Sequence, residues 1–251
     1  MHKTRIRLAA AVLPALVLTA ACSGSSGSSG SDGASKSPKS ASSGGSGGGG
    51  ATPLSKAQLT SALVKSGEVP GYSVEVSQTN DSADTSTLTA DKAECQPLAD
   101  VTSSKPKIPR KAFVGAAFAK TGTTTGTPTS TPDEINQMLL ASHAPGDAEK
   151  VIASVKTALG TCTTFTATDN TGTKTPFRIT KGPAVSVGDA SVSYVMSDTS
   201  DKASGAALVT VVRTGDTISA YLSVKSQGGA GSLPLEIARK QNEKLKAALG
   251  G

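Results

Sequence analysis

The feature that most constrains this chain is a run of glycine and serine between residues 23 and 50. These 28 residues hold 10 Gly and 12 Ser and almost no apolar side chain. Such a segment cannot bury enough surface to offset the entropy lost on ordering, so we expect a flexible tether. The 201 residues that follow are enough for one domain with its own hydrophobic core.

The first 21 residues have the pattern of an export signal. Three basic residues in Met1–Arg7 precede an apolar run, Leu8–Ala21, whose 14 residues are too few to cross a bilayer as a helix. The sequence Leu18-Thr19-Ala20-Ala21-Cys22 then resembles a bacterial lipobox, although Thr19 stands where Leu, Val or Ile is more common. A lipobox implies cleavage before Cys22 and a diacylglyceryl group on its sulfur. The alternative is an ordinary secreted protein that keeps Cys22 as a free thiol.

We therefore expect three parts: a lipoprotein signal peptide (1–21), a lipidated cysteine with its disordered tether (22–52), and an α+β domain (53–251). Two acyl chains would hold the protein stably at the outer face of the cytoplasmic membrane. The first 50 residues carry five of the 25 Lys and Arg and one of the 19 Asp and Glu, which leaves a net charge of about +2 on the rest. This near balance argues against nucleic acid as a partner.

The pattern of apolar residues after residue 53 predicts four helices and an antiparallel sheet. The helices are expected over 56–66, 91–101, 146–159 and from Pro234 to about Leu249. The strands are expected over 72–76, 112–119, 135–142, 175–180, 191–197, 206–213 and 217–224. Asp133-Glu134 could instead open a helix in place of the strand at 135–142, and residues 121–131 are expected to form a loop. In the last strand Ile218, Ala220, Leu222 and Val224 share one face. Helices at both ends of a run of strands predict a single antiparallel β-sheet with helices packed on one face.

Two cysteines remain in the expected domain, Cys95 and Cys162. In an exported protein such a pair is most simply one intradomain disulfide. It would close a loop of 67 residues, which the chain-entropy model values at roughly 4 kcal/mol. A redox pair or a zinc site is the alternative, and the spacing supports neither.

Four stretches of this region resemble a known group of proteins. They are KAQLTSALVKSGEVPGYSVEV (56–76), AECQPLAD (93–100), ALGTC (158–162) and VVRTGDTISAYLSV (211–224). They are similar to actinobacterial lipoproteins with a domain like the extracellular sensor domain of the mycobacterial serine/threonine kinase PknH. The resemblance implies an antiparallel sheet flanked by helices around a cleft, and a role in sensing or binding at the cell envelope. The sensor domain of that kinase has two disulfides, whereas this chain can form one. We also expect no kinase domain in this chain, so any signal would need a separate partner.

Catalytic motifs are missing from the sequence of the expected domain. His143 is its one histidine, in a loop before a helix, and Gly-x-Ser-x-Gly does not occur in 53–251. A histidine so placed is more often solvated or hydrogen-bonded at a helix approach than a general base. Phosphate-binding loops and the spacing of metal ligands are also lacking, so we expect neither an enzyme nor a cofactor or metal.

Two features could take part in binding an unknown envelope ligand or protein. Lys105, Lys107, Arg110 and Lys111 place four positive charges within seven residues, in what is otherwise a solvated loop. The seven aromatic residues are expected in the core, unless several line an apolar pocket. The leading hypothesis is a non-enzymatic, sensor-like lipoprotein; the alternatives are a carrier of a lipid or other hydrophobic ligand, and a purely structural envelope protein.

Overall fold

The computed structural model describes residues 52–77, 87–120, 133–201 and 205–250. The expected signal peptide, Cys22 with the tether up to residue 51, and the expected loop at 121–131 lie outside these residues. The helices are α1 (Lys56–Ala62), the 3-10 turn η1 (Ala93–Cys95), α2 (Gln96–Asp100), α3 (Asp147–Thr161) and α4 (Leu235–Ala248). The strands are β1 (Tyr72–Ser77), β2 (Thr89–Ala90), β3 (Ala112–Lys120), β4 (Glu134–Ser142), β5 (Thr164–Thr168), β6 (Lys174–Lys181), β7 (Ala190–Asp198), β8 (Ala206–Thr214) and β9 (Thr217–Lys225).

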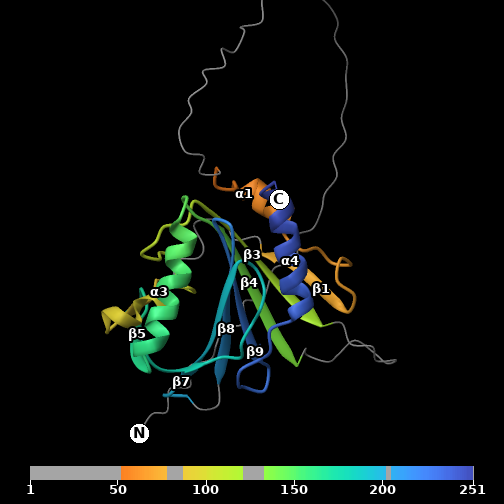
Figure 1. Ribbon diagram of the computed structural model, residues 1–251. Helices are drawn as coiled ribbons and strands as arrows, with labels where there is room; N and C mark the ends of the chain where they lie inside the picture. Colours follow the sequence, from red (N-terminus) through yellow and green to blue (C-terminus); the bar gives the residue numbers. More distant parts are fainter. Residues whose placement is uncertain (1–51, 78–86, 121–132, 202–204, 251) are drawn as a thin grey trace, which may run out of the picture. The chain divides into compact units, whose positions relative to one another are not determined.

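All the described strands form one antiparallel sheet in the order β1-β3-β4-β9-β8-β7-β6-β5-β2 (Figure 1). The hairpin of β8 and β9 lies at the centre of this sheet. Its two strands are joined by the tight turn that the sequence predicts, Arg213-Thr214-Gly215-Asp216, in which Gly215 adopts a positive φ of 56°. The α+β class and the single antiparallel sheet are therefore confirmed.

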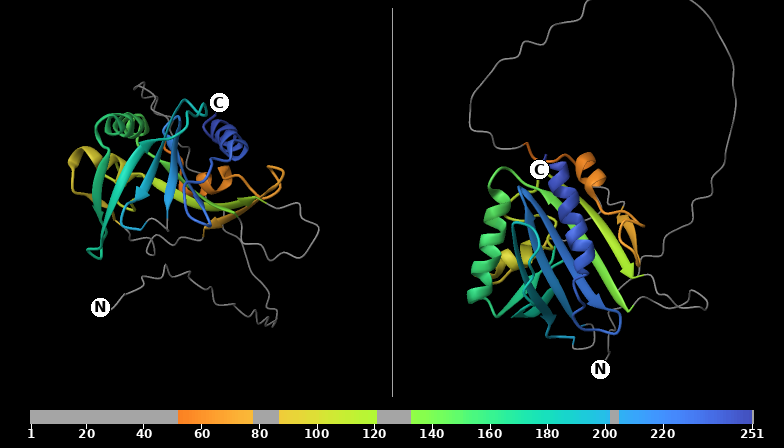
Figure 2. Two further views of the ribbon diagram at one scale, coloured as in Figure 1. Left: turned by 90° about the horizontal axis from the view of Figure 1, so that it is seen from below. Right: turned by 45° about the vertical axis from the view of Figure 1, so that its right-hand side comes forward.

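The helices pack as two pairs on opposite faces of this sheet. Along the adjacent strands β4, β9 and β8, neighbouring residues alternate between two hydrophobic cores, as strand geometry requires. Val211, Ala220 and Leu139 belong to the core beneath α2 and α3, whereas Val212, Tyr221 and Leu140 belong to the core beneath α1 and α4. Figures 1 and 2 show β8 and β9 running between α3 and α4. The expectation that the helices pack on one face is corrected here: each pair covers one face of its own half of the sheet.

The first helix is shorter than predicted because a side chain of α4 takes over its last backbone groups. The capping box of Ser55 and Gln58 begins α1 as expected. The helix ends at Ala62 rather than at residue 66. At this end, the buried side-chain amide of Gln241 accepts from the Val64 N–H (3.0 Å) and donates to the Ala62 carbonyl (2.8 Å). This exchange satisfies groups that the helix end would leave without partners.

Strands β2 and β5 were not expected from the sequence. In β5 the sequence TFTAT alternates, with Phe165 and Ala167 buried and the threonines around them more exposed.

No helix in the described part of the chain is long and apolar enough to cross a membrane.

Candidate functional site

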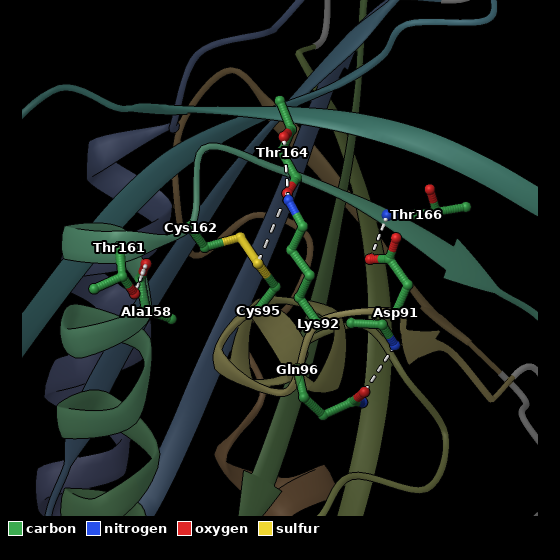
Figure 3. Close-up of a disulfide and its surroundings, with 10 residues drawn as sticks. Asp91, Lys92, Cys95, Gln96, Ala158, Thr161, Cys162, Thr164 and Thr166 are labelled. Carbon is green, nitrogen blue, oxygen red and sulfur yellow. Dashed lines mark hydrogen bonds between the residues drawn. A yellow bond between two sulfur atoms is a disulfide. The ribbon is translucent and has the colours of Figure 1, made fainter.

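The predicted disulfide is present and joins the helices on one face of the sheet. Cys95 ends the turn before α2, and Cys162 follows α3; both are buried, and their Cα atoms are 5.4 Å apart. Around them Lys92 donates to the Thr164 carbonyl (2.7 Å), and Asp91 accepts from the Thr166 N–H (2.9 Å) (Figure 3). The start of α2 is thus fixed both to the end of α3 and to β5.

A pocket of about 40 Å³ lies on the same face of the sheet as this bridge. Its floor consists of side chains from β4, β9 and β8. Leu139, Ala220 and Val211 lie opposite one another on these strands, and Ala141 is opposite Ile218. The two alanines leave the space, because their side chains end at Cβ where the neighbouring residues are larger.

The walls of the pocket come from α3 on one side and from α2 with the α2–β3 connection (101–111) on the other. The α3 wall is formed by Val151 and Ser154. The opposite wall is formed by Pro97, Asp100, Val101, Pro106, Ile108 and Arg110. Most of the lining is aliphatic or proline, with a few polar groups, which is the usual composition of a small-molecule site.

Arg110 holds the α2–β3 connection in place. Its guanidinium donates to the carbonyls of Ser103 (2.9 Å), Val101 (3.2 Å) and Asp100 (3.3 Å), at the end of α2. The same group lies 6.0 Å from the centre of the Phe113 ring. Arg110 is therefore a positioning residue for the wall of the pocket.

A second set of bonds closes the connection from the α2 side. The Asp100 carboxylate accepts from the Gln96 amide (2.7 Å) and from the backbone N–H of Lys107 (3.0 Å). Both of its oxygens are thus engaged within the wall.

His143 lines the pocket and is buried, with 3% of its surface exposed. Its Nδ1 lies 3.1 Å from the Pro109 carbonyl, which can only accept, so Nδ1 carries the proton. Burial, and to a lesser extent the charge of Arg110, lowers the pKa of His143 below its ordinary value of 6.5. The imidazole is therefore neutral at pH 7. The sequence allowed two structural roles for His143, a solvated side chain or a hydrogen bonder before a helix, and the structure shows the second.

The structure separates the four basic residues that the sequence grouped together. Arg110 is half-buried and bonded within the wall, whereas Lys105, Lys107 and Lys111 are exposed. Lys107 lies between two residues of the lining, Pro106 and Ile108. The sequence identified this segment but not the apolar pocket that it borders.

The aromatic residues do not form the pocket. Tyr194 and Tyr221 are among the largest fully buried side chains, and the Tyr194 hydroxyl donates to the Leu98 carbonyl (2.9 Å). Phe118 packs on Tyr221, and Phe165 packs on Phe177. These contacts give the aromatic residues the role in the core that the sequence favoured.

The polar groups at the pocket do not form a catalytic arrangement in the part of the chain that the structure describes. The ring nitrogen of His143 contacts a carbonyl rather than a carboxylate, and the Ser154 hydroxyl donates to the Val151 carbonyl (2.9 Å). Among the described residues, no group of three His, Cys, Asp or Glu side chains could hold a metal ion.

Comparison with known proteins gives a likeness of fold. The chain is similar to the crystal structure of the extracellular domain of PknH from Mycobacterium tuberculosis, with a TM-score of 0.51 and 12% sequence identity. The match covers 80% of this chain and 100% of that domain. No model of a protein family and no curated protein sequence matches the chain. The resemblance seen in the sequence is thus supported at the level of the fold.

Proposed function

We propose that this chain is a lipid-anchored lipoprotein of the actinobacterial cell envelope, with Cys22 acylated and residues 22–52 as its tether. In this proposal its α+β domain (53–251) lies outside the cytoplasmic membrane and binds a ligand or partner in a sensor-like role. The lipobox-like sequence and the likeness of fold to the extracellular domain of PknH support the location. The observation that carries the binding role is the pocket between α2, α3 and the sheet.

The size of the pocket favours recognition over carriage. A carrier of lipids needs a continuous apolar cavity of several hundred Å³ to enclose its cargo. The pocket described above has about 40 Å³, which suits one chemical group of a ligand rather than a whole lipid. The engaged polar groups at His143, Asp100 and Ser154 support a non-enzymatic role.

Native mass spectrometry of the whole chain purified from its own host tests the binding role. We expect a bound molecule that is lost in the variant Ala220→Val, because the two added methyl groups fill the pocket floor without disfavouring a strand. The matched control is Ala117→Val. Ala117 lies on the same face of the sheet, on β3, and is not part of the pocket lining.

Three results would contradict the proposal. The first is wild-type protein that carries no bound molecule, and the second is a bound molecule retained equally by both folded variants. The third is release of the molecule by Ala117→Val alone. Circular dichroism and thermal unfolding of each variant establish that the comparison is made between folded proteins.

A further inference from the structure

The second ring nitrogen of His143, Nε2, has no hydrogen-bond partner in the described part of the chain. Because Nδ1 donates its proton to the Pro109 carbonyl, Nε2 carries a lone pair and can only accept. Unlike the hydroxyls of Thr210 and Ser223, which are enclosed without a partner, Nε2 keeps some access to a small molecule. His143 is 3% exposed and lines the pocket, so a buried acceptor with remaining access lies at this site.

The other polar side chains of the lining are already bonded within the protein. The Ser154 hydroxyl donates to the Val151 carbonyl, and the Arg110 guanidinium donates to the carbonyls at the end of α2. Both oxygens of Asp100 accept N–H groups of the wall. The negative charge of Asp100 and the positive charge of Arg110 offset each other. The lining therefore presents an unpartnered acceptor and no net charge.

The volume of the pocket sets the size of the group that enters it. A single water molecule needs roughly 10–15 Å³ in this measure. The pocket of about 40 Å³ therefore has room for three or four non-hydrogen atoms. Its floor, made by Leu139, Ile218 and Val211 around two alanines, suits a short branched alkyl group with one polar atom.

We propose that the pocket binds a neutral hydroxyl group on a short branched alkyl chain, and that this hydroxyl donates its hydrogen to Nε2 of His143. This inference rests on the function proposed above and names the chemistry of the ligand. The alkyl group is recognised by the loss of its apolar surface from water, and the hydroxyl by the buried acceptor. A carbonyl of the same size would place an acceptor against Nε2 and leave both groups without a hydrogen bond.

The nitrogen NMR signals of the imidazole test the acceptor directly in the wild-type chain at pH 7.5. The chain has two histidines, His2 and His143, so the variant His143→Asn assigns the signals. We expect a ring with its proton on Nδ1, and a shift of the Nε2 signal toward the protonated range when propan-2-ol is added. A proton on Nε2 in the free protein, or an Nε2 signal that does not move with bound alcohol, would overturn the inference.

Three probes of nearly equal size and shape test the selectivity on the whole chain by saturation-transfer NMR. Propan-2-ol can donate a hydrogen bond, acetone can only accept, and isopropylammonium can donate but carries a positive charge. Propan-2-ol should bind about three- to tenfold more tightly than acetone, as one net hydrogen bond predicts. It should also bind more tightly than isopropylammonium, which loses its hydration in a pocket without net charge. Equal binding of alcohol and acetone, or tighter binding of the ammonium, would contradict the proposal.

Variants connect this selectivity to His143. In His143→Asn the amide can still donate to the Pro109 carbonyl but Nε2 is absent, so the preference for alcohol over acetone should fall to about one. The matched control is Thr210→Val, which removes a buried hydroxyl outside the pocket lining and should keep the preference. A preference kept in folded His143→Asn would refute the role of this residue. If His143→Asn does not fold, the wild-type nitrogen signal decides.

The variant Ala220→Val separates this inference from the proposed binding role. It should abolish the binding of propan-2-ol and of acetone, because it fills the pocket floor. Absence of binding by all three probes to the wild type would overturn the inference. The binding role would still stand if native mass spectrometry detected a ligand without a hydroxyl group that Ala220→Val releases.

Discussion

At the scale of single residues, His143 makes the clearest prediction about pH. Its pKa is lowered in the folded protein, so between that value and the ordinary 6.5 the unfolded chain binds more protons than the native one. Stability from this residue is therefore fully present above about pH 7 and is lost as the pH falls through 6.5 toward the lower folded value. We expect the free energy of unfolding, measured with urea, to decrease between pH 7.5 and pH 5.5.

The substitution His143→Asn should remove most of this decrease, because the asparagine amide can still donate to the Pro109 carbonyl but does not titrate. The measurement is confined to pH 5.5–7.5 so that His143 is separated from the acids. Glu68, Asp147 and Asp169 also have lowered pKa values, but their ordinary pKa values of 4.5 for Glu and 3.8 for Asp lie below this range. The same slope in both proteins would show that His143 is not the group responsible.

Individual residues also show where sequence reasoning stops. The alternation of Ile218, Ala220 and Leu222 predicted a shared face, and that face is the one that carries the pocket floor. The elements that cover this face could not be predicted, because nothing in the sequence of β9 indicates that α3 and the α2–β3 connection pack over it. Arg110 illustrates the same limit: its charge suggested solvent, whereas the carbonyls at the end of α2 draw it inward.

At the scale of elements, the disulfide should account for a large part of the stability of one half of the domain. Replacing both cysteines, as Cys95→Ala/Cys162→Ala, should lower the free energy of unfolding by roughly 4 kcal/mol for a loop of 67 residues. Alanine is chosen because both sites are buried and tolerate no new hydroxyl group. Urea unfolding of the variant and of the oxidised wild type checks this value.

Reduction of the wild-type disulfide provides an independent measure of the same quantity. The reduced wild type should unfold at nearly the same urea concentration as the double alanine variant. A loss below about 1 kcal/mol would mean that the 67-residue loop is already restricted in the unfolded chain, contrary to the chain-entropy account.

The elements were predicted better than their arrangement. Most helices and strands follow from local periodicity and caps, because each pattern is contained in its own segment. The end of α1 depended on Gln241, which is 177 residues from Val64, and so no local signal could mark it. The placement of the two helix pairs on opposite faces also depends on long-range packing, since an apolar stripe shows that a helix is covered but not by which face of a sheet.

At the scale of the whole molecule, the proposed anchor and tether determine what the domain can reach. If residues 23–50 form the proposed flexible tether, their 28 residues would have a root-mean-square span of roughly 30 Å and a limit of about 90 Å when fully extended. An anchored domain would therefore sample a shell close to the membrane, where a ligand at low bulk concentration can be locally abundant.

This arrangement depends on Cys22, and its substitution tests the anchor directly. In the host, the wild-type chain should sediment with membranes, and its N-terminal peptide should carry the mass of a diacylglyceryl group on Cys22. Cys22→Ser should remove that mass and shift the chain out of the membrane fraction, because two acyl chains supply the stable attachment. The double alanine variant of the disulfide serves as control, since it also removes cysteines and should stay with the membranes. Recovery of wild-type peptide with an unmodified Cys22 would instead favour an ordinary secreted protein, and the domain would then act without an anchor.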